Sequence, residues 1–409
     1  MNESSASAAR PGWWQQKQLV ALAWVATFLA CVLATHWSGY ELNDPDSRLY
    51  ARLSESTATQ PVATWAAPET TGRWSHDGYF YQHPPGMLWA GATMVRLGMG
   101  RYQAMYVVNF ASFFAVMLLL FAIGRALGGV RLGTTAVICW IVTPSFMQYL
   151  VRGNQEHPMA VSVTLGVYAL LVPSRPWARV LLLGAALGIG VLVKGIAGLG
   201  LIGIAGIWWL LYSRRLDRLF EIAAGCGIAA LIAGGLEAWH HANTGLSFWG
   251  SYVEVQLSPA VGAGVGITGK LYNLFFYLIR PWWFFFPWIV LVAYGLVRWV
   301  RSRGTEFKDV AWQLGLVTLG VFIFAFSLAQ RKAERYLFPS FPILALSAAW
   351  AVWHLPLPAR LERVRDAIAR RADWIPYGLM AIILIGVVLK IYVGTYHYSF
   401  IKIWPGHND

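Results

Sequence analysis

The sequence predicts an all-α protein that crosses a membrane many times. Of its 409 residues, 57% are hydrophobic and only 12% are charged, a composition typical of polytopic membrane proteins. A helix needs about 20 apolar residues to cross a hydrocarbon core of about 30 Å. Apolar runs of that length recur along nearly the whole chain with short basic interruptions. We therefore expect one integral membrane domain over residues 1–409.

The apolar runs predict about eleven transmembrane helices. The first run follows Arg10 and Lys17, but it has spanning length and no clear small-residue cleavage site. We interpret it as a retained helix rather than a signal peptide. The expected spans are 18–37, 103–127, 131–150, 157–173, 178–194, 196–213, 219–239, 277–298, 309–328, 336–354 and 375–394.

Basic residues predict the orientation of these helices. Cytoplasmic loops carry an excess of lysine and arginine, and alternate connections in this chain carry arginines. With those connections inside, the segments 38–102 and 240–276 lie outside the cytoplasm. The formal charge of +13 then reflects topology and anionic lipid, so we expect membrane lipids and no nucleic acid as partners. The clusters include Arg125 with Arg131, Arg175 with Arg179, and Arg214 and Arg215 with Arg218.

The two long outer segments, 38–102 and 240–276, are candidates for the roof of an active site. In the first, apolar residues at helical spacing predict an amphipathic helix over 47–56 that lies in the membrane interface. The apolar run 87–97 is too short to span and predicts a second interfacial helix. The other segment becomes glycine-rich at 262–269, which is typical of a flexible connector or of a mobile loop over a site.

The charged residues Asp44, Asp46 and Arg48 follow the first apolar run closely. A single Asp or Arg in the bilayer core costs about 2.5 to 3.5 kcal/mol on insertion scales, so this segment belongs at the membrane surface. Aspartate at a helix start also caps backbone amides. Spacing alone therefore leaves a capping role and a chemical role open for both carboxylates.

Four motifs occur in an order that resembles one family. They are DPDSRLYA at 44–51, YQHPPG at 81–86, GIGVLVKG at 188–195 and SLAQRKAERYLFPSFP at 327–342. Together they resemble the GT-C glycosyltransferases of the protein O-mannosyltransferase and aminoarabinose (lipid A) transferase type, which is glycosyltransferase family 39-like. The resemblance extends over roughly residues 40 to 345, and the last motif is the most specific.

The resemblance implies transfer of a sugar from a polyprenyl-phosphate donor to an acceptor hydroxyl, by direct displacement at the anomeric carbon. It implies a site on the outer face of the bacterial inner membrane, with a lipid-linked glycan, lipid A, a surface polymer or a protein as acceptor. A carboxylate of the first outer loop serves the family as general base. The matching residue here is Asp46, with Asp44 as second candidate. Proton removal by a placed carboxylate contributes on the order of 10² to 10⁴ in rate.

A phosphate leaving group requires cations at the outer membrane edge. Lys194 interrupts an apolar stretch and either binds phosphate or extends to the headgroups as an ordinary interfacial lysine. The resemblance favours phosphate. We expect donor phosphate contacts from Lys194, Lys332, Arg335, His83 and Arg48. We expect substrate contacts from Tyr81, Gln82, Glu156, His157 and Tyr336.

Three departures from the family pattern bear on mechanism. Ser47 and Gln82 stand where relatives have acids, so oxygen ligands of the kind that divalent metals prefer are missing. We predict an enzyme without a cofactor and independent of metal, with a divalent metal as the alternative. Leu49 stands where the family has an arginine, so Arg48 or Arg52 is expected to substitute.

Two other functions compete with the transferase. A transporter or flippase of lipid-linked glycans would also have many spans and charges at membrane depth, but the sequence has no convincing internal repeat. A polymerase or ligase of lipid-linked glycans would use a pyrophosphate-linked donor and a different base.

Overall fold

The computed structural model describes residues 44–150, 152–261, 266–302, 309–329 and 332–370. It divides into two compact units, Glu41–Leu355 and a second made of the two ends of the chain. In the second unit only 356–370 is described, with helix α17 (Ala359–Arg370). The predicted spans 18–37 and 375–394 lie outside the described residues. The single domain over 1–409 stays a prediction.

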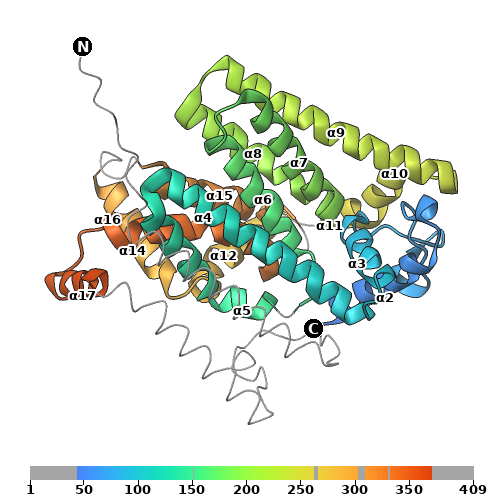
Figure 1. Cartoon of the computed structure of the whole chain (residues 1–409), viewed down its shortest axis with the longest axis horizontal. Helices are drawn as coiled ribbons and strands as arrows, with labels where there is room; N and C mark the ends of the chain where they lie inside the picture. Colours follow the sequence, from blue (N-terminus) through green and yellow to red (C-terminus); the bar gives the residue numbers. More distant parts are fainter. Residues whose placement is uncertain (1–43, 151, 262–265, 303–308, 330–331, 371–409) are drawn as a thin grey trace, which may run out of the picture. The chain divides into compact units, whose positions relative to one another are not determined.

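Unit Glu41–Leu355 is built almost entirely of helices, which confirms the predicted fold class (Figure 1). Its α-helices are α2 (Pro45–Thr59), α3 (Gly86–Arg96), α4 (Arg101–Ile141), α5 (Pro144–Leu150), α6 (Glu156–Leu171), α7 (Pro176–Lys194), α8 (Gly200–Trp208), α9 (Leu216–Thr244), α10 (Phe248–Tyr252), α11 (Ser258–Val261), α12 (Ile267–Ile279), α13 (Pro281–Phe284), α14 (Trp288–Arg301), α15 (Val310–Ser327) and α16 (Phe341–His354).

Short helical turns and one hairpin complete this unit. The 3₁₀ turns are η1 (Val62–Thr64), η2 (Gly72–Trp74), η3 (Gly195–Leu199) and η6 (Glu334–Ser340). Two π-helical turns extend neighbouring helices, η4 (Trp209–Ser213) and η5 (Val253–Leu257). The strands β1 (Ser75–His76) and β2 (Tyr79–Phe80) pair antiparallel, with Ser75 opposite Phe80 and His76 opposite Tyr79.

Five stretches of the described chain are long and apolar enough to cross a membrane. They are Arg101–Ile141, Pro176–Ser213, Leu216–Thr244, Val310–Ser327 and Glu334–His354. The chain is therefore a multi-pass membrane protein, whereas the predicted count of about eleven spans is not confirmed.

Local breaks explain where the predicted spans differ from the helices. Within α4, Gly128 and Gly129 leave the helical conformation, and Gly129 has φ +79°, a value open to glycine. The predicted spans 103–127 and 131–150 are thus two arms of α4, of which the second stops at Ile141. The predicted span 277–298 is divided into α12, α13 and α14, because Pro281 and Pro287 each remove a backbone N–H donor.

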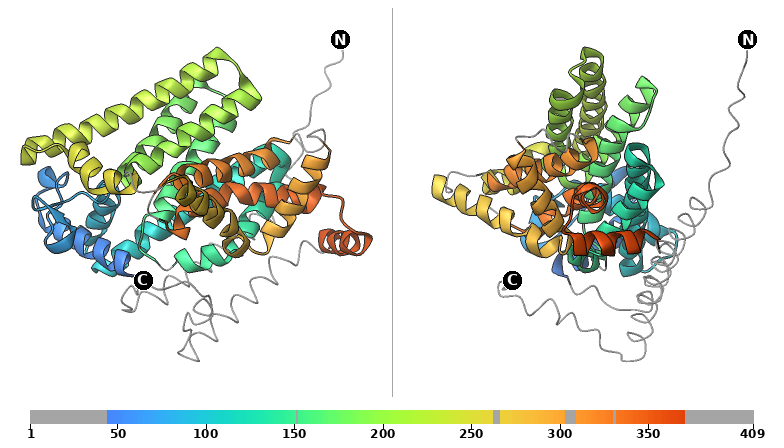
Figure 2. Two further views of the ribbon diagram at one scale, coloured as in Figure 1. Left: turned by 180° about the vertical axis from the view of Figure 1, so that it is seen from behind. Right: turned by 90° about the vertical axis from the view of Figure 1, so that its left-hand side faces the viewer.

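The core lies where α4, α6, α7, α15 and α16 pack together. Helix α16 is buried over most of its length, while α9 lies along α7 at the edge and exposes Phe220 and Leu231 (Figure 2). An apolar side chain left exposed in this way suits contact with lipid rather than water. The bundle therefore has a buried centre and apolar outer faces.

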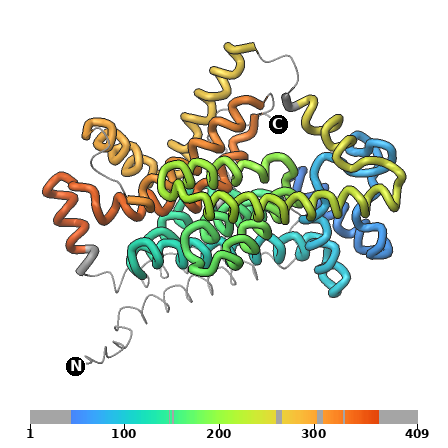
Figure 3. The backbone as a smooth tube through the Cα atoms, turned by 90° about the horizontal axis from the view of Figure 1, so that it is seen from above, coloured from blue at the N-terminus to red at the C-terminus, as the bar shows by residue number. Residues whose placement is uncertain are grey.

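The outer segments gather at one end of the bundle. Both predicted helices of the first segment are present as α2 and α3. These two helices lie beside the end of α9 and beside α10 (Figures 1 and 3). The side chain of Trp239 donates to the carbonyl of Ala63 at 2.5 Å, and Trp89 donates to that of Trp65 at 2.7 Å. The second segment is mainly helical where it is described, since α9 continues to Thr244 and α12 begins at Ile267. Residues 262–265 of its glycine-rich part lie outside the described residues, so the predicted connector or loop stays a prediction.

Candidate active site

Asp44 caps the first helix of the outer segment. Its Oδ2 atom accepts hydrogen bonds from the backbone N–H of Ser47 at 3.1 Å and from the Ser47 hydroxyl at 2.7 Å. Its Oδ1 atom lies 3.8 Å from Arg152 Nη1. Ser47 is thus part of a helix cap. Asp44 has the capping role that the sequence left open.

Asp46 lies in the first turn of α2 and faces a cation. Its Oδ2 atom is 2.7 Å from Arg335 Nη1, and its side chain keeps 27% of its surface exposed. Arg335 comes from η6, so the contact joins opposite ends of the described sequence. Of the two candidate bases, Asp46 is therefore the one whose carboxylate is not used to cap the helix.

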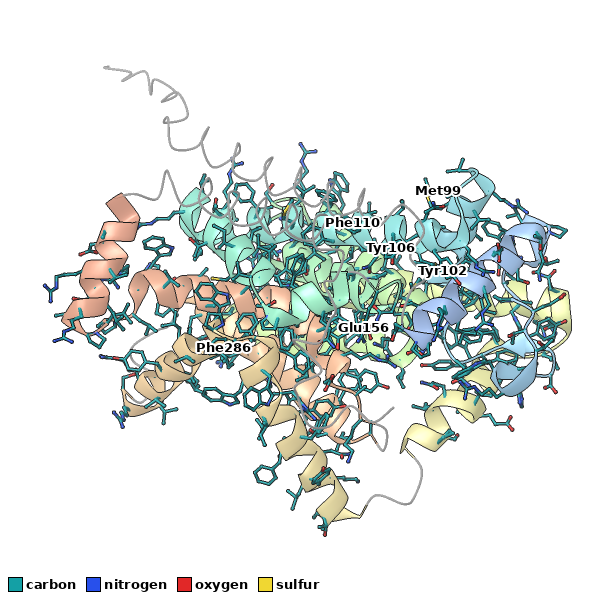
Figure 4. All side chains as sticks on the ribbon, turned by 90° about the horizontal axis from the view of Figure 1, so that it is seen from below. Met99, Tyr102, Tyr106, Phe110, Glu156 and Phe286 are labelled. Atoms are coloured by element: carbon teal, nitrogen blue, oxygen red, sulfur yellow. The ribbon has the colours of Figure 1, made fainter. Side chains whose placement is uncertain are left out.

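Glu156 is the buried centre of the charge cluster. It is the first residue of α6, and its side chain is only 3% exposed. Its Oε1 atom lies 3.2 Å from Lys194 Nζ and 3.6 Å from Arg335 Nε. Figure 4 shows Glu156 toward the middle of the helices. Arg335 therefore bridges two carboxylates, Asp46 and Glu156, and Lys194 pairs with the second.

The ends of four elements bring these charges together, namely the starts of α2, α6 and η6 and the end of α7. Lys194 is the last residue of α7 and is followed by Gly195, which has φ +58° and ends the helix. Lys194 Nζ also lies 5.0 Å from the centre of the Tyr336 ring, a distance at which a cation is attracted to an aromatic face. Tyr336 therefore borders the cluster, and its contact with substrate stays a prediction.

His83 lies against the cluster as a neutral ring. Burial, and then the positive charges of Lys194 and Arg335, lower the pKa of His83 to about 3. The ring lies edge-on to Tyr50, with 6.2 Å between centroids. Burial and the nearby Asp46 carboxylate raise the pKa of Tyr50 well above its usual value. At neutral pH both side chains are therefore uncharged neighbours of the ion pairs.

Three predicted site residues, Lys332, Arg48 and Gln82, form no ion pair with the charge cluster. Lys332 is exposed, with its Nζ 4.1 Å from the ring centre of Tyr272 on α12. Arg48 is half-buried on α2, and Gln82 is half-buried beside His83. Neither of these two side chains forms a hydrogen bond or an ion pair among the described residues.

Tyr81 and His157 are core residues of two separate clusters. The Tyr81 hydroxyl lies 3.0 Å from His240 Nε2, and His240 Nδ1 lies 3.0 Å from the carbonyl of Ala66. Since a carbonyl only accepts, Nδ1 carries the proton and Tyr81 donates to Nε2. His157 is fully buried. Its ring contacts those of Phe113, Trp140, Phe146 and Phe338.

Sequence reasoning does not identify Arg152, which pairs with Asp44. The sequence could have indicated Arg152, because it is a basic residue in a connection that the charge pattern places outside the cytoplasm. Arg335 is identified in the same way.

Among the residues that the structure describes, no three His, Cys, Asp or Glu side chains gather as metal ligands do. Asp46 and Glu156 instead each face a cation. Metal independence stays a prediction.

The fold and the cluster together define a helical membrane protein with a charged site at the end of its bundle. Residues 82–234 match the family described as dolichyl-phosphate-mannose-protein mannosyltransferase. This match includes His83, Glu156 and Lys194, and it excludes Asp46 and Arg335. A search of curated proteins found no match.

Solved structures show the same fold. ArnT from Cupriavidus metallidurans bound to undecaprenyl phosphate superposes with a TM-score of 0.66 at 16% identity, over 95% of this chain and 66% of that one. The apo state of ArnT gives 0.65 at 18% identity, over 85% and 62%. The archaeal oligosaccharyltransferase AglB from Archaeoglobus fulgidus, in complex with an inhibitory peptide and a dolichol-phosphate, gives 0.59 at 14% identity, over 91% and 56%.

These comparisons confirm the resemblance to GT-C glycosyltransferases and the GT-C fold of this chain. The chain spans less than two thirds of the length of these relatives. At such low identity a structural likeness establishes fold and not activity.

Proposed function

We propose that this protein transfers a sugar from a polyprenyl-phosphate donor to an acceptor hydroxyl on the outer face of a bacterial inner membrane. The observation that carries the proposal is a cluster of two carboxylates and two cations. The partly exposed Asp46 lies 2.7 Å from Arg335, and the buried Glu156 lies 3.2 Å from Lys194 and 3.6 Å from Arg335. A transfer reaction needs both kinds of group, a base for the acceptor and cations for the leaving phosphate.

The cations would hold the donor phosphate. As the bond from the sugar to the phosphate breaks, the bonding electrons move to the phosphate, whose single negative charge as a diester rises toward two as a monoester. Lys194 and Arg335 would stabilise that added charge. Glu156 contacts both cations, so the phosphate would compete with Glu156 for them. His83 would contribute a hydrogen bond from its neutral ring.

Asp46 would act as the general base. The acceptor hydroxyl gives its proton to the carboxylate while its oxygen attacks the anomeric carbon, so the new bond forms as the bond to phosphate breaks. Such a direct displacement inverts the anomeric configuration. Arg335 already contacts Oδ2 of Asp46, so the acceptor would approach through the exposed part of the carboxylate. Asp44 is the weaker candidate because its oxygens contact Ser47 and Arg152.

The carrier and acceptor are proposed by class. A structural relative binds undecaprenyl phosphate and another binds a dolichol-phosphate and a peptide, which supports a polyprenyl-phosphate carrier here. The acceptor class comprises a lipid-linked glycan, lipid A, a surface polymer or a protein.

The experiment is a donor-release assay on the purified protein in detergent. A panel of undecaprenyl-phosphate sugars is incubated with and without heat-treated membrane extract as acceptor, and free undecaprenyl phosphate is followed by mass spectrometry. Release that requires the extract is expected of a transferase. No release from any donor, together with donor flipping in sealed liposomes, would overturn the proposal in favour of a transporter.

A further inference from the structure

Two buried tyrosines contact the backbone beside the two cations of the site. Tyr252, on α10, is 3% exposed. Its hydroxyl donates to the carbonyl of Lys194 at 3.5 Å and accepts from the N–H of Ile196 at 3.4 Å. Tyr277, on α12, is fully buried, and its hydroxyl accepts from the N–H of Ala333 at 3.3 Å. Each hydroxyl thus lies within two residues of Lys194 or of Arg335.

The Tyr252 contact lies where α7 ends. The last carbonyls of a helix have no partner within the helix, and Tyr252 supplies one for Lys194. A Cβ atom added at Gly195 would lie 2.4 Å from the Tyr252 oxygen, so the hydroxyl can approach only because this residue is glycine. The hydroxyl and the glycine together fix the direction in which the chain leaves α7, and with it the base of the Lys194 side chain.

The Tyr277 contact belongs to a second attachment. Asn273, one helical turn earlier on α12, donates to the carbonyl of Ala329 at 2.6 Å. Tyr277 holds Ala333, two residues before Arg335. Helix α12 therefore binds the chain both at the end of α15 and just ahead of η6. This attachment sets the start of η6, from which Arg335 extends toward Asp46 and Glu156.

Tyr252 is itself held by a rigid aromatic cluster. Its ring stacks on Phe248 at 13° with 6.3 Å between centroids, and Phe248 contacts Tyr81. Tyr81 lies two residues before His83. The same buried cluster therefore connects the segment that carries His83 with the end of α7 that carries Lys194.

We propose that Tyr252 and Tyr277 are positioning residues, which hold the backbone at Lys194 and Arg335 so that both cations meet one phosphate. The inference rests on the proposed function, since it assigns a purpose to these contacts only if the cations bind the carrier phosphate. It assigns the second outer segment, 240–276, a role beyond covering the site, because Tyr252 belongs to it and Tyr277 directly follows its last residue.

The test measures binding of undecaprenyl phosphate and of undecaprenol, which lacks the phosphate, to the full-length protein in detergent. In Tyr252→Phe and Tyr277→Phe we expect phosphate affinity to fall about three- to tenfold, the size of one hydrogen bond, with unchanged affinity for undecaprenol. A merely structural role would weaken both ligands alike. The matched control is Tyr212→Phe, which removes a hydrogen bond from Tyr212 in η4 to Gln313 in α15.

A double-mutant cycle tests through which cation each tyrosine affects phosphate affinity. If Tyr252 acts through Lys194, Tyr252→Phe has no further effect in a Lys194→Met background but keeps its effect in Arg335→Met. Tyr277→Phe should show the reverse pattern. Full phosphate affinity in both tyrosine variants, with Lys194→Met still impaired, would overturn the inference and leave the proposed function standing. Equal affinity of the wild type for undecaprenol and its phosphate would overturn both.

Discussion

Glu156→Gln is expected to weaken the fold and to strengthen phosphate binding. The carboxylate of Glu156 pairs with both Lys194 and Arg335. An incoming phosphate must share these cations with it. Glutamine keeps the shape of the side chain and an oxygen for Lys194 but removes the competing charge. The matched variant Lys194→Met breaks the same ion pair from the other side and removes a phosphate ligand.

The magnitude follows from the burial of the pair. With the Glu156 side chain only 3% exposed, solvent screens the interaction little. Removing one partner of a buried ion pair costs about 3 to 5 kcal/mol, and the retained oxygen favours the lower value, about 3 kcal/mol. We expect the affinity for undecaprenyl phosphate to rise about tenfold, which corresponds to about 1.4 kcal/mol.

Thermal unfolding in detergent with and without undecaprenyl phosphate measures both effects. Both variants should unfold at lower temperature than the wild type. Because a ligand stabilises by RT ln(1 + [L]/Kd), the phosphate should raise the Tm of Glu156→Gln more than that of the wild type, and that of Lys194→Met less. Weaker phosphate binding in Glu156→Gln, to the level of Lys194→Met, would refute the reasoning that the carboxylate and the phosphate compete.

Three other predictions concern pH, the helix cap and metal. His83 has a pKa of about 3 against about 6.5 when unfolded, so its contribution to stability is lost as pH falls below about 6.5, by about 2 kcal/mol at pH 5. The unfolding free energy of His83→Gln should fall less between pH 7 and pH 5 than that of the wild type, and an equal fall would contradict the assignment. Asp44→Ala should cost about 1 kcal/mol of unfolding free energy, whereas Asp44→Asn, which keeps a cap, should cost less. Sugar transfer should survive EDTA, and a loss reversed by Mg²⁺ or Mn²⁺ would show that metal is required.

The sequence predicts the parts of this protein that depend on local composition. Apolar runs of spanning length indicate the membrane class, and helical spacing indicates α2 and α3. Lys194 can be singled out because a lysine in an apolar stretch is costly unless it has a partner. Glu156 and Arg335 can be singled out because they are charges placed on the outer side.

The remaining features depend on contacts between distant segments. The sequence around Asp46 does not show that Arg335 is its partner. It likewise does not show that Asp44 pairs with Arg152. The sequence also leaves open which of the two aspartates caps α2. The hydrogen bonds between Asp44 and Ser47 decide this. The break in α4 at Gly128 and Gly129 is instead a local feature, and the sequence predicts it as the gap between the spans 103–127 and 131–150.

The most direct test of the account compares Asp46→Asn with Asp44→Asn in the donor-release assay. The two variants remove the same charge two residues apart, and asparagine at 44 still caps α2. We expect release of undecaprenyl phosphate by the wild type and by Asp44→Asn, and release slower by about 10² or more in Asp46→Asn, the contribution of a general base. Full activity of Asp46→Asn would contradict the central claim that this carboxylate takes the acceptor proton.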